Sequence, residues 1–122
     1  MGNSIKKAKT SIQNKNAAAL LKTLKNRKIT LAAFENSDKN MYSMLHYIIW
    51  NGGDANLCQV VYNIYHDECL SRVDKVDATP LHAAAITGNL SIVQWIMNKR
   101  KGVLNETEIK TIGGETPLMW AW

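Results

Sequence analysis

The fold of this chain is decided by the twelve residues ATPLHAAAITGN, Ala78 to Asn89. Proline is favoured in the first turn of a helix, where its fixed φ and missing N–H carry no cost, and Thr79 supplies an oxygen that can cap this turn. Glycine adopts the left-handed conformation that often ends a helix. The stretch therefore predicts a short helix that begins at Pro80 and ends before Gly88.

A second helix is predicted directly after Gly88. Its apolar residues recur at helical spacing over about ten positions, at Leu90, Ile92, Val93, Ile96 and Met97. The first helix has only a narrow apolar face, formed by Leu81, Ala84 and Ala85. Two helices this short cannot bury their own apolar faces, so the pair requires similar units stacked beside it.

Similar units are present on both sides of this pair. Downstream, GETPLMWA (114–121) repeats the pattern, with Thr116 lying 37 residues after Thr79. Upstream, Ser43-Met44-Leu45-His46 and the apolar positions that follow Gly52 repeat it, with Leu45 lying 36 residues before Leu81. The stretch AAALLKTL (17–24) is interpreted as one helix of a more degenerate unit with a polar outer face.

These units resemble ankyrin repeats, which have a period of about 33 residues. The resemblance implies an all-α solenoid of stacked helix-turn-helix units joined by short tip loops. It divides the chain into a basic amino-terminal segment (1–15), a degenerate capping repeat (16–37), a divergent repeat (38–73), a clear repeat (74–110) and the start of a further, incomplete repeat (111–122). Because the last repeat stops inside its first helix, we expect the chain to be part of a longer protein.

The charge of the chain is concentrated at its amino end. Residues 1–34 hold eight basic side chains and no acidic one, whereas the remaining 88 residues have a net charge of −3. Three interpretations are open for the basic block: an ordinary solvated helix face, an anionic membrane surface, or nucleic acid. Nucleic acid is the least favoured, because no aromatic residue on which a base could stack lies within the block before Phe34.

The membrane interpretation is supported by Gly2, which follows the initiator Met and is the acceptor position for an N-myristoyl group. Lys6 stands where Ser or Thr is usual in that motif. A single myristoyl chain binds membranes weakly, and a second signal from basic residues strengthens the binding. The candidate membrane-surface residues are Lys6, Lys7, Lys9 and Lys15. An accidental glycine after Met is the alternative. We expect a cytoplasmic protein, either free or peripherally bound to a membrane.

The sequence gives no sign of a catalytic or metal site. His46 and His82 occupy the Thr-Pro-Leu-His position, where the resemblance implies that histidine bonds the backbone of the adjacent repeat. His66, Cys58 and Cys69 have the spacing of no common structural zinc site. We therefore expect no enzymatic activity, no metal and no cofactor from this segment, and reduced cysteines.

The resemblance implies a protein partner, bound on the concave surface formed by the tips and the exposed sides of the first helices. The predicted partner-binding residues are Lys39, Asn40, Tyr42, Trp50, Asn51, Lys75, Val76, Ala78, Ile86, Thr87, Ile112 and Glu115, with Gly113 in the third tip. Tyr42, Trp50, Val76, Ile86 and Ile112 would form an apolar stripe of the kind that interface hot spots favour. Packing between imperfect repeats is the alternative role for Trp50 and Ile86.

Two function classes follow. The first is an adaptor or scaffold that binds a partner protein, with or without a membrane tether. The second is the substrate-docking head of a larger enzyme, because Thr116-Pro117-Leu118-Met119-Trp120-Ala121 is similar to a phrase in ankyrin-bearing DHHC-type protein palmitoyltransferases.

Overall fold

The computed structural model describes residues 2–100, and all of its regular structure is helical. The elements are α1 (Gly2–Gln13), α2 (Ala17–Arg27), α3 (Leu31–Asn36), α4 (Met44–Trp50), α5 (Ala55–Tyr65), the 3-10 helix η1 (His66–Leu70), α6 (Pro80–Thr87) and α7 (Leu90–Lys99). The predicted third tip and the incomplete repeat at 111–122 lie outside the described residues. Between residues 2 and 100, no helix is both long and apolar enough to cross a bilayer.

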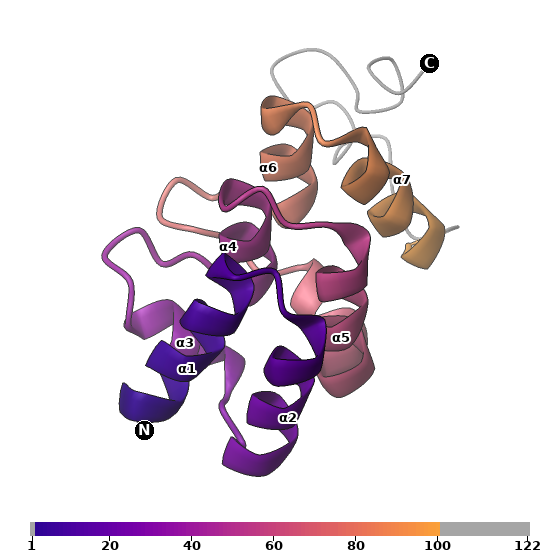
Figure 1. The fold of residues 1–122 in the computed structure, drawn as a ribbon. Helices are drawn as coiled ribbons and strands as arrows, with labels where there is room; N and C mark the ends of the chain where they lie inside the picture. Colours follow the sequence, from indigo (N-terminus) through magenta and orange to yellow (C-terminus); the bar gives the residue numbers. More distant parts are fainter. Residues whose placement is uncertain (1, 101–122) are drawn as a thin grey trace.

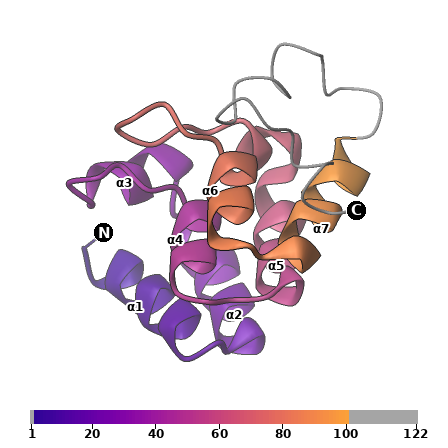
Figure 2. The same ribbon diagram turned by 90° about the horizontal axis from the view of Figure 1, so that it is seen from above.

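The helices form two stacked rows, as Figures 1 and 2 show. Helix α4 lies between α1 and α6 in one row, and α5 lies between α2 and α7 in the other. Each member of the first row also packs against its sequence neighbour in the second row, as α1 against α2, α4 against α5 and α6 against α7. The all-α solenoid of helix pairs predicted from the sequence is confirmed.

The pair α6–α7 has the boundaries that the sequence predicted. Thr79 caps α6 by accepting a hydrogen bond from the backbone N–H of His82, and Pro80 occupies the first turn. Gly88 ends the helix in the left-handed conformation, with φ of 73°. Helix α7 then runs for ten residues from Leu90. Local propensity and tertiary packing agree throughout this unit.

All three pairs are joined by the same turn. A left-handed residue follows the first helix each time, namely Lys15, Gly52 and Gly88, with φ of 55°, 72° and 73°. The next N–H donates five residues back, from Asn16 to Ser11 O, Gly53 to Ile48 O and Asn89 to Ala84 O. This is the hydrogen bond of a Schellman motif. The shared turn sets a register in which Gln13, Trp50 and Ile86 occupy equivalent positions.

The first helix of the first pair, α1, lies wholly inside the basic segment 1–15. Ile5, Ala8 and Ile12 fall on one side of α1 and are buried against its neighbours. Its partner α2 buries Leu20 and Leu24 and is capped by Asn16, which accepts from the backbone N–H of Ala19. The amino-terminal charge is thus carried by a packed helix pair.

Polar side chains connect successive units at intervals close to one repeat. The pairs are Gln13 with Tyr47, Ile29 O with Tyr65, Glu35 with Arg72, His46 with Ala78 O, Gly53 O with Asn89, and Gln59 with Trp95. The Glu35 link is the strongest by geometry, since Arg72 donates from Nε and Nη2 to the two carboxylate oxygens at 2.6 Å each. These links fix the register of one unit on the next.

Candidate protein-binding surface

Two tips project beside the first row of helices: residues 38–42, the first tip, and residues 74–78, the second tip. They share one conformation, because Asp38 and Asp74 each accept, through Oδ1, the backbone N–H two residues ahead. Met41 and Asp77 follow at equivalent positions with φ of 55° and 62°. Aspartate tolerates the left-handed conformation better than most residues, and the divergent repeat forms the same turn with Met41.

The two tips are joined by backbone. The N–H of Lys75 donates to the carbonyl of Asn40 at 2.9 Å. A shallow depression of about 70 Å³ lies between the tips, lined by Asn40, Tyr42, Asp74, Lys75 and Val76. Val76 is 77% exposed at its edge. The structure therefore brings together four of the predicted partner-binding residues, Asn40, Tyr42, Lys75 and Val76.

The exposed ends of α4 and α6 continue this surface. Trp50 is 45% exposed and stacks on Tyr42, with ring centroids 6.2 Å apart. Ile86 is 61% exposed and holds the equivalent position on α6, the helix that packs on α4. Tyr42 also stacks on His46, at 6.0 Å between centroids. Because Tyr42 supports one face of Trp50, the indole is held in place while a large part of it stays accessible.

His46 supports the surface from below. Its Nδ1 lies 3.3 Å from the backbone N of Ser43, which can only donate, and its Nε2 lies 2.7 Å from Ala78 O, which can only accept. The ring is therefore neutral, with its proton on Nε2. Burial lowers the pKa of His46 below its ordinary value, which the hydrogen bond to Ala78 only partly offsets. His82 repeats the bond to its capping residue, Thr79.

The other predicted partner-binding residues have these places. Lys39 and Thr87 are exposed, and the Thr87 hydroxyl donates to Ala83 O. Asn51 is half-buried, and its side chain donates to Tyr47 O. The Ala78 carbonyl is used in the bond with His46. Ile112 and Glu115 lie outside the described residues, as does the phrase Thr116–Ala121.

A cluster that the sequence reasoning missed lies between α1 and α4. The Nζ of Lys9 lies 5.5 Å from the centre of the Phe34 ring and 5.6 Å from that of Tyr47, within the range of cation–π attraction. Phe34 and Tyr47 meet edge to face at 5.9 Å, and Gln13 donates to the Tyr47 hydroxyl at 2.7 Å. The signal that could have found it is the spacing of Ile5, Ala8 and Ile12, which places Lys9 beside the buried face of a helix.

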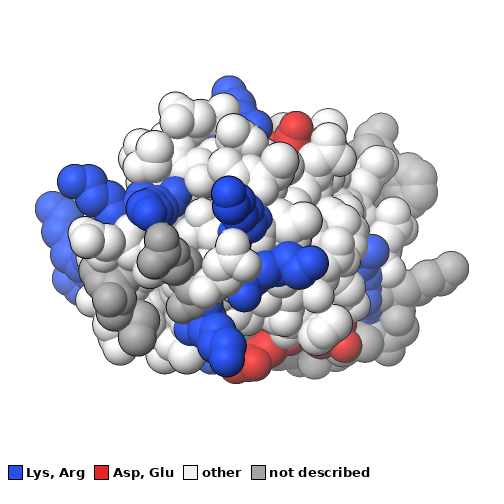
Figure 3. All heavy atoms as spheres, turned by 60° about the horizontal axis from the view of Figure 1, so that its bottom comes forward, with Lys and Arg blue, Asp and Glu red and all other residues white. Residues whose placement is uncertain are grey.

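The predicted membrane-surface lysines separate into two groups. Lys6 and Lys7 are exposed and line a groove of about 740 Å³ beside α1 and α2. Lys9 belongs to the aromatic cluster, and Lys15 lies in the turn after α1, with Nζ near Gly52. Gly2 is the first residue of α1. Figure 3 shows more basic than acidic side chains on the face turned toward the viewer.

The two cysteines lie on α5 and η1, respectively. Cys58 and Cys69 are buried free thiols. Burial raises the pKa of the Cys58 thiol above its usual range and that of Cys69 to about 12, so both remain protonated and unreactive. In the part of the chain that the structure describes, no three His, Cys, Asp or Glu side chains gather as metal ligands would.

Comparison with known proteins agrees with this architecture. A search of curated proteins finds no match to the chain. A family model described as ankyrin repeats, in three copies, matches residues 45–122, which is more than half of the chain and includes α4 to α7. Stacked helix pairs, repeated Schellman turns and paired tips are what such repeats require. The chain belongs to the ankyrin-repeat family.

Proposed function

We propose that this chain binds a partner protein on the surface formed by the two tips and the exposed ends of α4 and α6. Ankyrin repeats generally mediate protein–protein interaction, and the proposal here concerns which residues make the contact. The observation that carries it is the exposure of Trp50, Ile86 and Val76 on adjoining units. Large aromatic and aliphatic side chains held in place at a surface are typical anchors of protein interfaces.

The arrangement suits a partner that supplies an apolar segment. Trp50 stacks on Tyr42 and is still 45% exposed, so a partner side chain can cover the exposed part of the indole. The surrounding tip residues Lys39 and Lys75 are exposed and polar, as expected for the rim of an interface. An anchor that is already fixed loses little conformational entropy on binding.

The test is capture of partners with the full chain as bait, beside two double variants. Trp50→Ala with Ile86→Ala removes the proposed anchors. Val73→Ala with Leu90→Ala removes two other exposed apolar side chains and serves as the matched control. We expect proteins retained by the parent and the control to be lost from the first variant, by about tenfold or more. Equal capture by all three baits would refute the proposal.

As a second element, we propose that the amino end tethers the chain to a membrane. Gly2 opens α1 and is an acceptor position for a myristoyl group, and the exposed Lys6 and Lys7 lie on the same helix. The test is incorporation of labelled myristate by an N-myristoyltransferase in a cell-free system, with Gly2→Ala as control. Label in the parent alone supports acylation, and absence of label from both would end this part of the proposal.

A further inference from the structure

The helix pair α1–α2 forms one end of the stack. Its inner side packs against α4 and α5, and we call its opposite side the end face. The residues of the end face are exposed positions of the two helices, and of the turn between them, that lie away from the core: Asn3, Lys6, Lys7, Thr10, Asn14, Lys22 and Asn26. No other element of residues 2–100 covers them, and the groove described above runs along this side.

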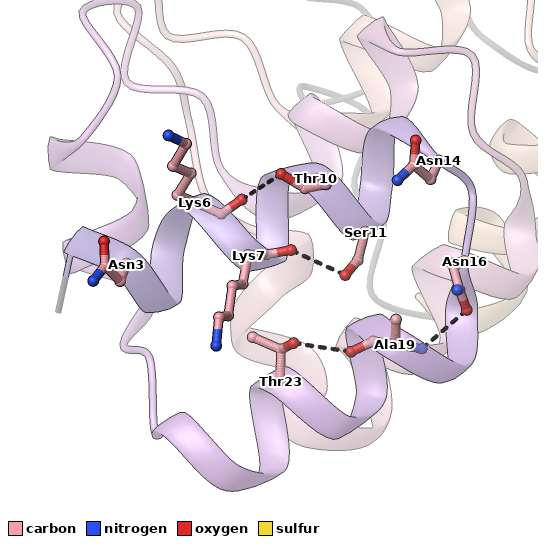
Figure 4. Close-up of a pocket in the computed structure, with 9 residues that line it drawn as sticks. All are labelled: Asn3, Lys6, Lys7, Thr10, Ser11, Asn14, Asn16, Ala19 and Thr23. Carbon is pink, nitrogen blue, oxygen red and sulfur yellow. Dashed lines mark hydrogen bonds between the residues drawn. The ribbon is translucent and has the colours of Figure 1, made fainter.

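In α1 the inner and outer sides are sharply divided. Ile5, Ala8 and Ile12 are buried, and at about 100° per residue Thr10 and Asn3 lie on the opposite side of the helix. Lys6 and Lys7 lie on either flank of Thr10, and Figure 4 shows their side chains diverging from α1 in different directions. The Thr10 hydroxyl is engaged locally, since it donates to Lys6 O at 2.9 Å.

Helix α2 is also divided into a buried inner side and an exposed outer side, and its outer side belongs to the end face. Leu20 and Leu24 are buried, and α2 packs on α5. Lys22 is two residues from each leucine, about 200° around the helix, so it points away from α5. Thr23 and Ala19 line the groove that separates α2 from α1. The end face is therefore a layer of two helices, about 18 Å long, with lysines on both.

The charge of this layer is uncompensated. Neither α1 nor α2 contains an acidic residue. Within residues 2–100, none of Lys6, Lys7 and Lys22 forms an ion pair with a carboxylate. The end face also has no large apolar side chain, which distinguishes it from the apolar surface at Trp50 and Ile86. Its chemistry fits a broad anionic surface better than an apolar partner.

We propose that the end face docks flat on a bilayer that contains anionic phospholipid, through Lys6, Lys7 and Lys22. The inference rests on the membrane tether proposed above and assigns its geometry. A myristoyl group on Gly2 would enter the bilayer from the first turn of the same layer, so the two signals act on one side of the molecule. Single-stranded nucleic acid is the poorer fit, because the end face offers no aromatic ring for base stacking.

Docking in this direction leaves the other surface free. Trp50 and Ile86 belong to the second and third units of the stack, whereas the end face belongs to the first. Lys9 takes no part, because its Nζ lies over the Phe34 and Tyr47 rings. A chain bound through the end face thus presents its tips and its partner surface beside the membrane.

The test is sedimentation of the unacylated full chain with vesicles of phosphatidylcholine alone and of phosphatidylcholine mixed with phosphatidylserine. Lys6→Gln with Lys7→Gln neutralises the end face, and Lys39→Gln with Lys75→Gln removes the same charge from the tips. Each lysine near an anionic surface contributes about fivefold to binding, so we expect the first variant, which lacks two of them, to bind mixed vesicles about 30-fold more weakly. The tip variant should change by about threefold or less, because screening limits the reach of its charges.

Three results would overturn the proposal. One is an absence of binding to mixed vesicles by both the unacylated chain and a chain myristoylated at Gly2. Another is an equal loss in the two lysine variants, which would assign the binding to net charge. The third is release from vesicles by single-stranded RNA with the same lysine dependence, which would indicate nucleic acid. Label without vesicle binding would leave acylation intact and refute only the docking, so the two proposals fail separately.

Discussion

His66 has a strained backbone, and relieving that strain is expected to stabilise the fold. Its φ is 58° and its ψ is −145° where α5 gives way to η1, close to a region that only glycine occupies readily. Such a conformation costs about 1–3 kcal/mol. Replacing His66 by Gly removes this cost. The greater conformational freedom of glycine in the unfolded chain opposes the gain and destabilises the fold by about 0.4–1 kcal/mol.

The comparison that isolates this effect is His66→Gly against His66→Ala. The histidine side chain is exposed and meets Tyr62 edge to face, with centroids 6.4 Å apart. Both variants lose that contact, so they differ only by the Cβ atom. The balance of the two terms makes the Gly variant more stable than the Ala variant by about 0.5–2 kcal/mol, or about 2–8 °C in melting temperature for a domain of this size.

The assay is urea unfolding followed by far-ultraviolet circular dichroism, with a thermal scan as a second measurement. The slope of the free energy of unfolding against urea concentration should be the same for both variants, since the surface exposed on unfolding does not change. A Gly variant equal to the Ala variant, or less stable, would show that the turn after α5 carries no conformational strain and would refute the reasoning.

Three further predictions concern the links between units. Replacing Arg72 by Met leaves the buried Glu35 carboxylate without its two hydrogen bonds and should lower the free energy of unfolding by about 2–3 kcal/mol, less than for a fully buried pair because Arg72 is partly exposed. Adding Glu35→Leu to the same chain should restore most of this free energy, as measured by urea unfolding. If no stability is recovered, the ion pair does not account for the loss. Because the pKa of His46 is lowered in the folded chain, the unfolded chain takes up a proton first as the pH falls. The contribution of neutral His46 to the free energy of unfolding is therefore fully present above about pH 6.5 and is lost as pH falls below that value. Below that pH the free energy of unfolding should decline more steeply for the parent than for His46→Gln, and parallel curves would contradict the neutral ring. Gly53→Ala would place a Cβ 2.6 Å from Ile48 Cγ2 and 3.0 Å from the Ile48 carbonyl oxygen, so we expect a loss of about 1–3 kcal/mol by thermal unfolding, and an unchanged melting temperature would show that the turn can relax.

The helix pair that the sequence predicted best is the one in which several local signals coincide. Thr79, Pro80 and Gly88 each act at one position only, so both ends of α6 could be placed from sequence. In α1 the apolar residues Ile5 and Ile12 are separated by lysines, and no acidic residue stands in the first turn. Because the lysines between these apolar residues make the spacing hard to recognise, residues 1–15 are identified from the sequence only as a basic segment, and α1 is not predicted.

The candidate surface shows the same limit. The repeat register was enough to place Trp50 and Ile86 at equivalent positions, because the turns after α4 and α6 are the same. Register alone could not show that Tyr42 stacks on Trp50 or that Lys9 lies over Phe34 and Tyr47, since both contacts depend on how adjoining units are rotated against each other. Side-chain contacts across units follow from tertiary packing, which a repeat period does not specify.

The polar links between units also determine how the chain would respond to a pulling force. Each of the described links joins residues about one unit apart; Ile29 and Tyr65, for example, are separated by 36 positions. Tension applied at the two ends would load these links one after another, and losing one would not release the next. A single detached unit lengthens the chain by about 12 nm when fully extended. Under tension the molecule would therefore unfold one unit at a time, in steps of equal length. When the tension is released, it would refold by adding units to those that remained folded.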